Sequence, residues 1–164
     1  MKLPLSLCAL VLSATTAFAD ADLPDSNLIT PSDLPKPVLE LAQKTCKQNE
    51  GLTDTAKWTI HKLTVPLYKL TAPEAFLYFV QCIPAGSNDI HFVIRMPEGD
   101  EDNVRLLNFG KDNIRVFNVQ WNDETKTLTD ISGVSASCAH QRTWQWIEKN
   151  NAFKLSSEEK LGCN

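Results

Sequence analysis

Apolar positions recur along this chain at two different periods, and the period changes close to Gly51. Before that glycine, apolar and small residues recur at helical spacing, and Pro35 suits the first turn of a helix. These recurring positions are Val38, Leu41, Ala42, Thr45 and Cys46. The pattern predicts one amphipathic helix from about Pro35 to Lys47, with Cys46 on its buried face.

After Gly51 the period is two, which is typical of β-strands. Turn residues separate short apolar or alternating runs at 57–65, 73–82, 89–96, 103–109, 113–121, 126–132, 142–148 and 152–155. Connections this short join antiparallel neighbours, because a parallel crossover needs about a dozen residues or more. The sequence therefore predicts an α+β fold, with one N-terminal helix packed on an antiparallel β-meander of seven or eight strands.

Alternation within the run 142–148 places Trp144 and Trp146 on the same face of one strand. Two interpretations remain open at this point. The indoles either close the core of the sheet, each burying on the order of 200 Å², or form an exposed aromatic recognition surface.

The first nineteen residues have the layout of a secretory signal peptide. Lys2 provides a basic start, residues 3–12 are an apolar run, and Ala17 and Ala19 are small residues three and one positions before the expected cleavage point. We expect residues 1–19 to be removed after Ala19. Polar residues interrupt the apolar run too early for a membrane span, so we expect no stable membrane insertion.

The remaining residues, 20–164, suffice for a single domain with one core. The full chain has a net charge of −4, which becomes −5 once Lys2 leaves with the signal peptide. An acidic chain repels the phosphates of nucleic acid and favours a basic protein partner. We therefore expect a protein partner and no nucleic acid.

The cysteine count indicates disulfides. Cys8 leaves with the signal peptide, and Cys46, Cys82, Cys138 and Cys163 remain. An even number of cysteines in a small exported domain is typical of disulfides, whereas zinc sites usually bring cysteines in close pairs. Four cysteines allow three connectivities. Of these we expect Cys46–Cys82, between the helix and the end of a strand, and Cys138–Cys163, across the C-terminal hairpin.

The densest charge run is PEGDEDN, whose acidic residues are Glu98, Asp100, Glu101 and Asp102. It lacks the alternating ligand order of a calcium loop, and four like charges repel one another unless something binds them. We consider these four residues the candidate partner-binding site. The alternative is a solvated turn between two strands.

No catalytic or metal-binding motif stands out in the sequence. His61, His91 and His140 are isolated, and the glycines do not form a phosphate-binding loop. We therefore expect no catalytic residues, no metal and no cofactor. An enzyme would have to assemble its site from scattered residues, and such a site would require a polar cavity that holds at least two of the three histidines.

Several stretches resemble a known family. They are an early helix ending in cysteine (LPKPVLELAQKTC), a strand ending in cysteine (FLYFVQC), the hairpin VQWNDETKTLTDIS and the closing stretch SCAHQRTWQWIEKNNAFKLSSEEKLGC. In these the chain resembles the exported bacterial proteins of the domain of unknown function 1176 family, best from Val119 to Cys163. The resemblance implies a place in the bacterial envelope and no established chemistry.

Export, small size, acidity and a disulfide framework together favour a periplasmic protein-binding inhibitor. It would be an immunity protein that neutralises a secreted antibacterial, cell-wall-targeting effector, or an inhibitor of a lysozyme-type hydrolase. The main alternative is a non-catalytic envelope-maintenance domain. An enzyme and a small-molecule binder are two further alternatives.

Overall fold

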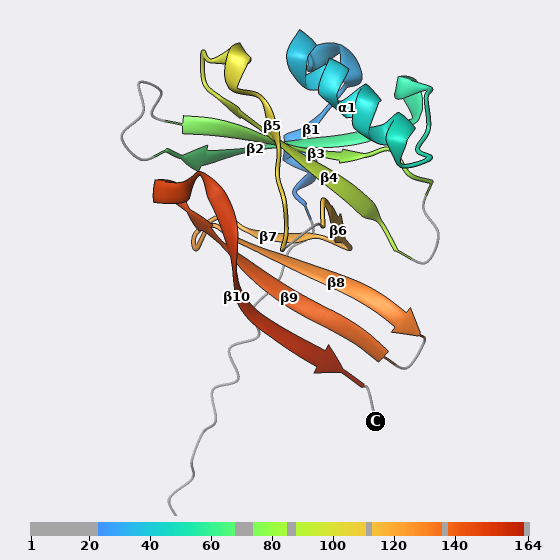
Figure 1. Cartoon of the computed structure of the whole chain (residues 1–164), viewed down its shortest axis with the longest axis vertical. Helices are drawn as coiled ribbons and strands as arrows, with labels where there is room; N and C mark the ends of the chain where they lie inside the picture. The colour runs from blue at the N-terminus through green and yellow to red at the C-terminus, as the bar shows by residue number, and fades with distance from the viewer. Residues whose placement is uncertain (1–22, 68–73, 85–87, 111–112, 136–137, 163–164) are drawn as a thin grey trace, which may run out of the picture.

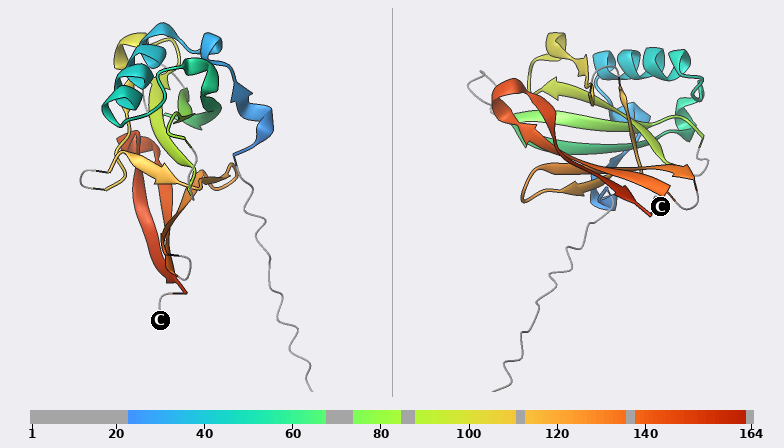
Figure 2. Two further views of the ribbon diagram at one scale, coloured as in Figure 1. Left: turned by 90° about the vertical axis from the view of Figure 1, so that its right-hand side faces the viewer. Right: turned by 60° about the horizontal axis from the view of Figure 1, so that its bottom comes forward.

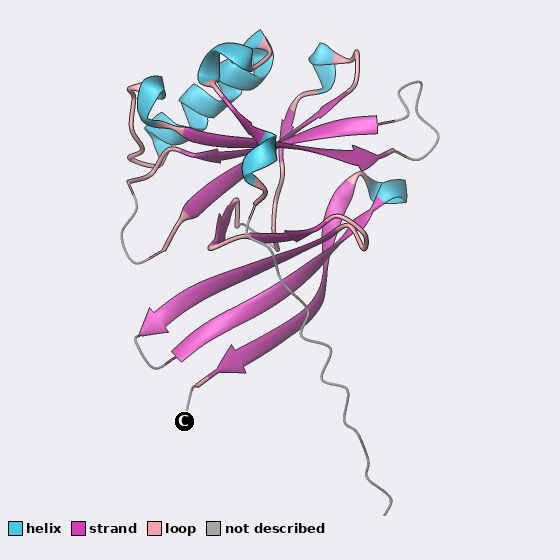
Figure 3. Cartoon of the chain, turned by 180° about the vertical axis from the view of Figure 1, so that it is seen from behind, coloured by secondary structure: helices cyan, strands magenta, loops and turns pink. Residues whose placement is uncertain are grey.

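A computed structural model describes residues 23–67, 74–84, 88–110, 113–135 and 138–162. They form three layers (Figures 1 and 3). The helix α1 (Lys36–Gln48) lies on one face of a six-stranded antiparallel sheet, and a four-stranded antiparallel sheet lies on the other face. The α+β class and the antiparallel pairing predicted from the sequence are confirmed.

The six-stranded sheet follows the chain order β1-β2-β3-β4-β5, and β6 also pairs with β4. Its strands are β1 (Leu28–Ile29), β2 (Thr59–Pro66), β3 (Glu74–Gln81), β4 (Ile90–Pro97), β5 (Arg105–Leu106) and β6 (Arg115–Phe117). The short strands β5 and β6 pair with the same edge of β4, β6 near its start and β5 near its end.

The four-stranded sheet has the order β10-β9-β8-β7. Its strands are β7 (Gln120–Asn122), β8 (Thr127–Ser135), β9 (Cys138–Ile147) and β10 (Ala152–Leu161). The last three strands are longer than the sequence pattern predicted, and their far ends project beyond the first sheet (Figures 1 and 2). The polar residues of these far ends do not alternate with apolar ones, so the pattern did not reveal the full strand length.

The meander is divided between two sheets rather than continuous in one, which corrects the sequence-based prediction. The predicted strand 113–121 breaks at Asn118, where the backbone is left-handed with a φ of 43°. The segment before the break pairs with β4 as β6, and the segment after it pairs with β8 as β7. A left-handed residue ends the extended conformation, and Asn is among the few side chains that tolerate it.

Alternation along the first sheet produces two cores. On one face Ile60, Val80 and Phe92 pack against Val38 and the rest of the buried face of α1. On the other face, residues of β2, β3 and β4 pack against the second sheet.

The indoles of Trp144 and Trp146 lie in the core between the sheets, each with 4% of its surface exposed. Trp146 Nε1 donates a hydrogen bond of 2.9 Å to the carbonyl oxygen of Pro66, on the first sheet. The interpretation of the two tryptophans as core residues is therefore correct, and their interpretation as an exposed recognition surface is wrong.

The helix agrees with the prediction to within one residue at each end, and Cys46 is buried. Cys46 is bonded to Cys82, with 6.0 Å between their Cα atoms. Gly51 lies against this bond, since a Cβ atom there would come within 3.1 Å of Cys82 Sγ. The second predicted bond, Cys138–Cys163, involves a residue outside the described part of the chain and stays a prediction, as do the signal peptide and its cleavage.

Candidate functional site

The predicted partner-binding residues lie in one turn, which we call the acidic turn (residues 98–102). It follows β4 and leads through a short 3-10 helix, Glu101–Asn103, into β5. Glu98, Glu101 and Asp102 are exposed, whereas Asp100 is half-buried. Three of the four predicted carboxylates therefore face solvent.

Backbone hydrogen bonds hold the acidic turn in place. Glu98 N donates to Glu74 O at 3.0 Å, and Asp100 N donates to Pro97 O at 3.2 Å. Gly99 has a φ of 71°, and no atom lies within 4 Å of the place where a Cβ would be. The turn therefore needs this glycine for its conformation and not for space.

Asp100 differs from the other acidic residues because its carboxylate is hydrogen-bonded to a nearby side chain of the protein. Its Oδ2 accepts a hydrogen bond of 2.5 Å from Asn103 Nδ2. Glu101 and Asp102 instead share a shallow hollow with Glu40 and Lys44 of α1. The candidate partner-binding surface therefore reduces to the three exposed carboxylates.

A second candidate site is a cavity of about 530 Å³ that we call the histidine cavity. His61 of β2 and His91 of β4 lie on either side of β3 and point to the face that meets the second sheet. The remaining lining residues are Leu23, Asp25, Gln81, Asp89, Asn118, Val119, Gln120 and Ile131. The cavity lies by the start of β4 and the acidic turn follows its end, so the two candidate sites are at opposite ends of one strand.

The two histidines of this cavity have different environments. His61 Nδ1 lies 3.4 Å from the carbonyl oxygen of Pro24. His91 Nδ1 is buried and has no hydrogen-bond partner among the described residues. Burial, reinforced by His61 and opposed by Asp89, lowers the pKa of His91 to about 4. His91 is therefore a neutral ring at neutral pH.

The chemistry available to the histidine cavity follows from that neutral ring. A general base works best when its pKa is near the working pH, so a group with a pKa of about 4 is a weak base at neutral pH. Across the described ranges, no group of three or more His, Cys, Asp or Glu residues has the arrangement to hold a metal ion. At neutral pH the neutral ring of His91 therefore gives the cavity a polar group and not a strong base.

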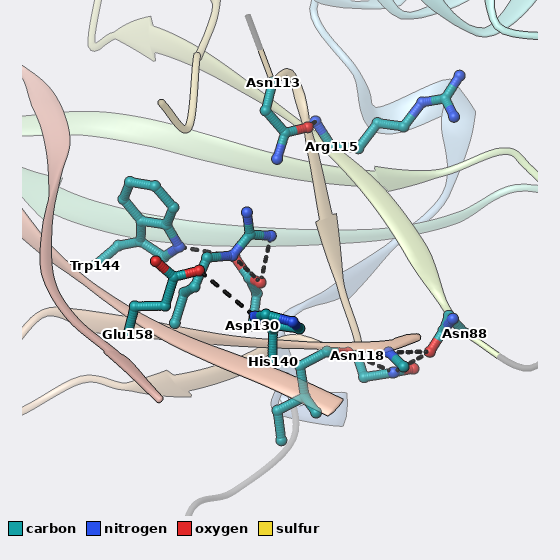
Figure 4. A network of polar contacts seen from close by, with 11 residues as sticks. Asn88, Asn113, Arg115, Asn118, Asp130, His140, Trp144 and Glu158 are labelled. Carbon is teal, nitrogen blue, oxygen red and sulfur yellow. Dashed lines mark hydrogen bonds and ion pairs between the residues drawn. The ribbon is translucent and has the colours of Figure 1, made fainter. Parts of the chain in front are cut away.

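His140 lies apart from this cavity, on β9, 3.7 Å from Glu158 of β10 (Figure 4). On β8, the strand on the other side of β9, the fully buried Asp130 accepts hydrogen bonds from Arg142 and from Trp144 Nε1 of β9 (Figure 4). Burial raises the pKa of Asp130, although the bonds from Arg142 and Trp144 oppose this change. We interpret this network as structural, because its donors and acceptor satisfy one another.

The structure brings together only part of what the sequence singled out. It places His61 and His91 in one cavity, which is the arrangement that a histidine-based enzyme site would require.

Sequence reasoning missed Arg95, a buried arginine near the acidic turn, because an arginine within an alternating strand is usually solvent-facing. The available signal was its position between Ile94 and Met96, in a run that is otherwise apolar.

Comparisons of the chain with protein-family models, with curated proteins and with solved structures find no match. The resemblance to the domain of unknown function 1176 family therefore stays a prediction. In the part of the chain that the structure describes, no helix is both long and apolar enough to cross a membrane.

Proposed function

We propose that this protein is an exported protein-binding inhibitor whose acidic turn contacts a basic partner, such as a secreted antibacterial effector or a lysozyme-type wall hydrolase. The observation that carries the proposal is the exposure of Glu98, Glu101 and Asp102 on a turn held by backbone hydrogen bonds. A preorganised turn loses little conformational entropy when it binds.

Charge supports the same proposal. The chain has a net charge of −4, and the three carboxylates concentrate negative charge at one end of β4. Complementary charges on two proteins mainly accelerate association and select the partner. The export and the periplasmic location that the proposal requires follow from the predicted signal peptide.

The test uses the mature, oxidised protein as bait in periplasmic extract and with the products of neighbouring genes, followed by kinetics with the purified partner. The variant Glu98→Gln/Glu101→Gln/Asp102→Asn removes the exposed charges and leaves Asp100 in place. We expect association to slow by roughly tenfold or more at low salt, with less difference at high salt. The wall-degrading activity of a captured hydrolase should fall when the parent protein is added.

The matched control is Glu124→Gln/Glu148→Gln/Glu159→Gln, which removes the same charge from three exposed residues outside the turn. Equal slowing in both triple variants would reject the acidic turn as the contact site. Absence of any specific partner for the parent protein would favour the envelope-maintenance alternative.

A second candidate function is an enzyme whose site is the histidine cavity. Its support is that His61 and His91 line one cavity. The weak basicity of His91 argues against it. A turnover assay on candidate periplasmic substrates, with His61→Gln and His91→Gln as controls, tests this function directly.

A further inference from the structure

Another cavity, of about 410 Å³, lies between the end of β4 and the start of β10, and we call it the arginine cavity. It is separate from the histidine cavity and shares no residue with it. Its charged lining residues are Arg95, Arg105 and Asp100, and the lining is otherwise rich in asparagine. Its volume is within the range of small-molecule sites.

Arg95 is the central feature of this cavity. Only 4% of its surface is exposed, yet the one hydrogen bond that its side chain makes among the described residues is long, 3.3 Å from Nη2 to the carbonyl oxygen of Asn103. Its Nε is buried and has no partner among the residues that the structure describes. A buried charge with an unused donor is costly, so such a group is usually paired with an anion.

The neighbours of Arg95 do not neutralise it. Arg105 is close enough to lower the pKa of Arg95, together with the larger effect of burial, while Asp100 acts in the opposite direction. Asp100 is already bonded to Asn103. The charged lining residues, two arginines and one aspartate, therefore carry a formal charge of +1, which matches a single negative charge on the ligand.

An unused acceptor belongs to a residue that lines the same cavity. Asn151, the left-handed residue that ends the turn before β10, has a buried Oδ1 without a partner in the described part of the chain. A ligand that satisfies both unused groups needs an anionic acceptor for Arg95 and an N–H or O–H donor for Asn151.

We propose that the arginine cavity binds a single carboxylate group with a neighbouring hydrogen-bond donor, as in the C-terminal residue of a peptide or the zwitterion of a free amino acid. The carboxylate accepts from Arg95 with Arg105 beside it, and the donor of the ligand reaches Asn151 Oδ1. This site goes beyond the proposed inhibitor function, since its ligand is a small molecule or chain end held by its carboxylate, whereas the partner of the acidic turn is a basic protein.

The experiment is an NMR titration of the mature, oxidised, ¹⁵N-labelled protein, followed at the Arg95 Nε–H resonance. The probes are N-acetylalanine, free alanine, acetate, N-acetylalaninamide and inorganic phosphate. We expect saturable binding of N-acetylalanine or free alanine, weaker binding of acetate, and none of the uncharged amide. Tighter binding of N-acetylalanine indicates a peptide terminus as the source, and tighter binding of alanine indicates a free amino acid.

Three variants locate the ligand. Arg105→Gln should weaken binding of the carboxylates by about tenfold, since it removes a charge beside the ligand. Asn151→Gly keeps a residue that tolerates the left-handed conformation and removes Oδ1, so N-acetylalanine should bind only as well as acetate. Lys36→Gln removes an equal charge from an exposed helical residue and should change nothing.

Several results would overturn the proposal. They are no saturable shift with any carboxylate, equal binding of the amide and the acid, tighter binding of phosphate than of the carboxylates, or equal weakening by Lys36→Gln and Arg105→Gln. All three variants keep Arg95. Because Arg105, Asn151 and Lys36 are not buried, we expect these variants to fold.

Discussion

Trp144 Nε1 donates a hydrogen bond of 2.7 Å to Asp130 Oδ2, and Asp130 has no exposed surface. Arg142 donates to the other carboxylate oxygen from both Nε and Nη2, at 2.9 and 2.7 Å. One aspartate therefore satisfies an indole and a guanidinium from the adjacent strand, at the boundary between the core and the projecting part of the second sheet.

Asp130→Ala should lower the free energy of unfolding by about 3–5 kcal/mol, because it leaves Arg142 and Trp144 with unpaired donors. Urea denaturation measures this loss. In a double-mutant cycle, Arg142→Ala should cost much less in the Asp130→Ala background than in the parent protein. Independent, additive costs would show that the two residues do not act together.

The stability of the protein should depend on pH through His91. The unfolded chain binds a proton at this residue near pH 6.5, whereas the folded chain binds it only near pH 4. Acidification through this window therefore favours unfolding, and the contribution lost by pH 4 is up to about 3 kcal/mol. Urea denaturation between pH 7 and pH 4 measures it.

His91→Gln removes the titrating group from this window and should flatten the pH dependence of unfolding. His61 and Asp89 face the same cavity and remain in the variant. His140→Gln, on the far part of β9, is the matched control and should keep the slope of the parent protein. An unchanged slope in His91→Gln would show that other groups cause the acid sensitivity.

Asn118 should tolerate glycine better than alanine. Its side chain accepts from Asp89 N and donates to Asn88 Oδ1 and to the carbonyl oxygen of Ile131. Both substitutions remove these bonds, but only alanine also strains the left-handed backbone, at a cost of roughly 1–2 kcal/mol. Asn118→Ala should therefore be less stable than Asn118→Gly by that amount, and equal stabilities would contradict a conformational role for the residue.

Cys46→Ser and Cys82→Ser should destabilise the protein alike, by roughly 3–4 kcal/mol in the chain-entropy model. The bond closes a separation of 36 residues. Peptide mapping without reduction should recover a Cys138–Cys163 link in both variants. Recovery of a Cys46–Cys138 link from the parent protein would refute the pairing, and the reduced parent protein provides the control for both measurements.

The prediction of the fold was accurate where the structure depends on local signals. The helix agrees to within one residue, because apolar spacing and Pro35 define it without help from distant residues. The antiparallel pairing was also predictable, since short connections allow no other arrangement. The division of the predicted strand 113–121 into two strands could not be predicted, because an asparagine within an alternating pattern does not by itself indicate a left-handed backbone.

The candidate sites were less predictable than the fold. The acidic turn is visible in the sequence as a run of charge, but the inward bond of Asp100 to Asn103 is not. The histidine cavity depends on the register that places His61 and His91 on the same face of the sheet on either side of β3. Alternation assigns each histidine to a face of its own strand, but which residues of β2 and β4 lie level with one another depends on how both strands pair with β3.

The helix, the antiparallel strands and the position of the acidic turn were all readable from the amino-acid pattern, whereas the Cys46–Cys82 bond was one expected pairing among three possible connectivities and is confirmed by the structure. Three features became apparent only in the folded chain: the strands form two sheets, both tryptophans are buried between them, and Arg95 and Asn151 line one cavity. The two groups of features differ in the sequence distance between the residues that cause them. Periodicity and short connections act within a few residues, whereas the packing of two sheets sums contacts between segments far apart in the chain.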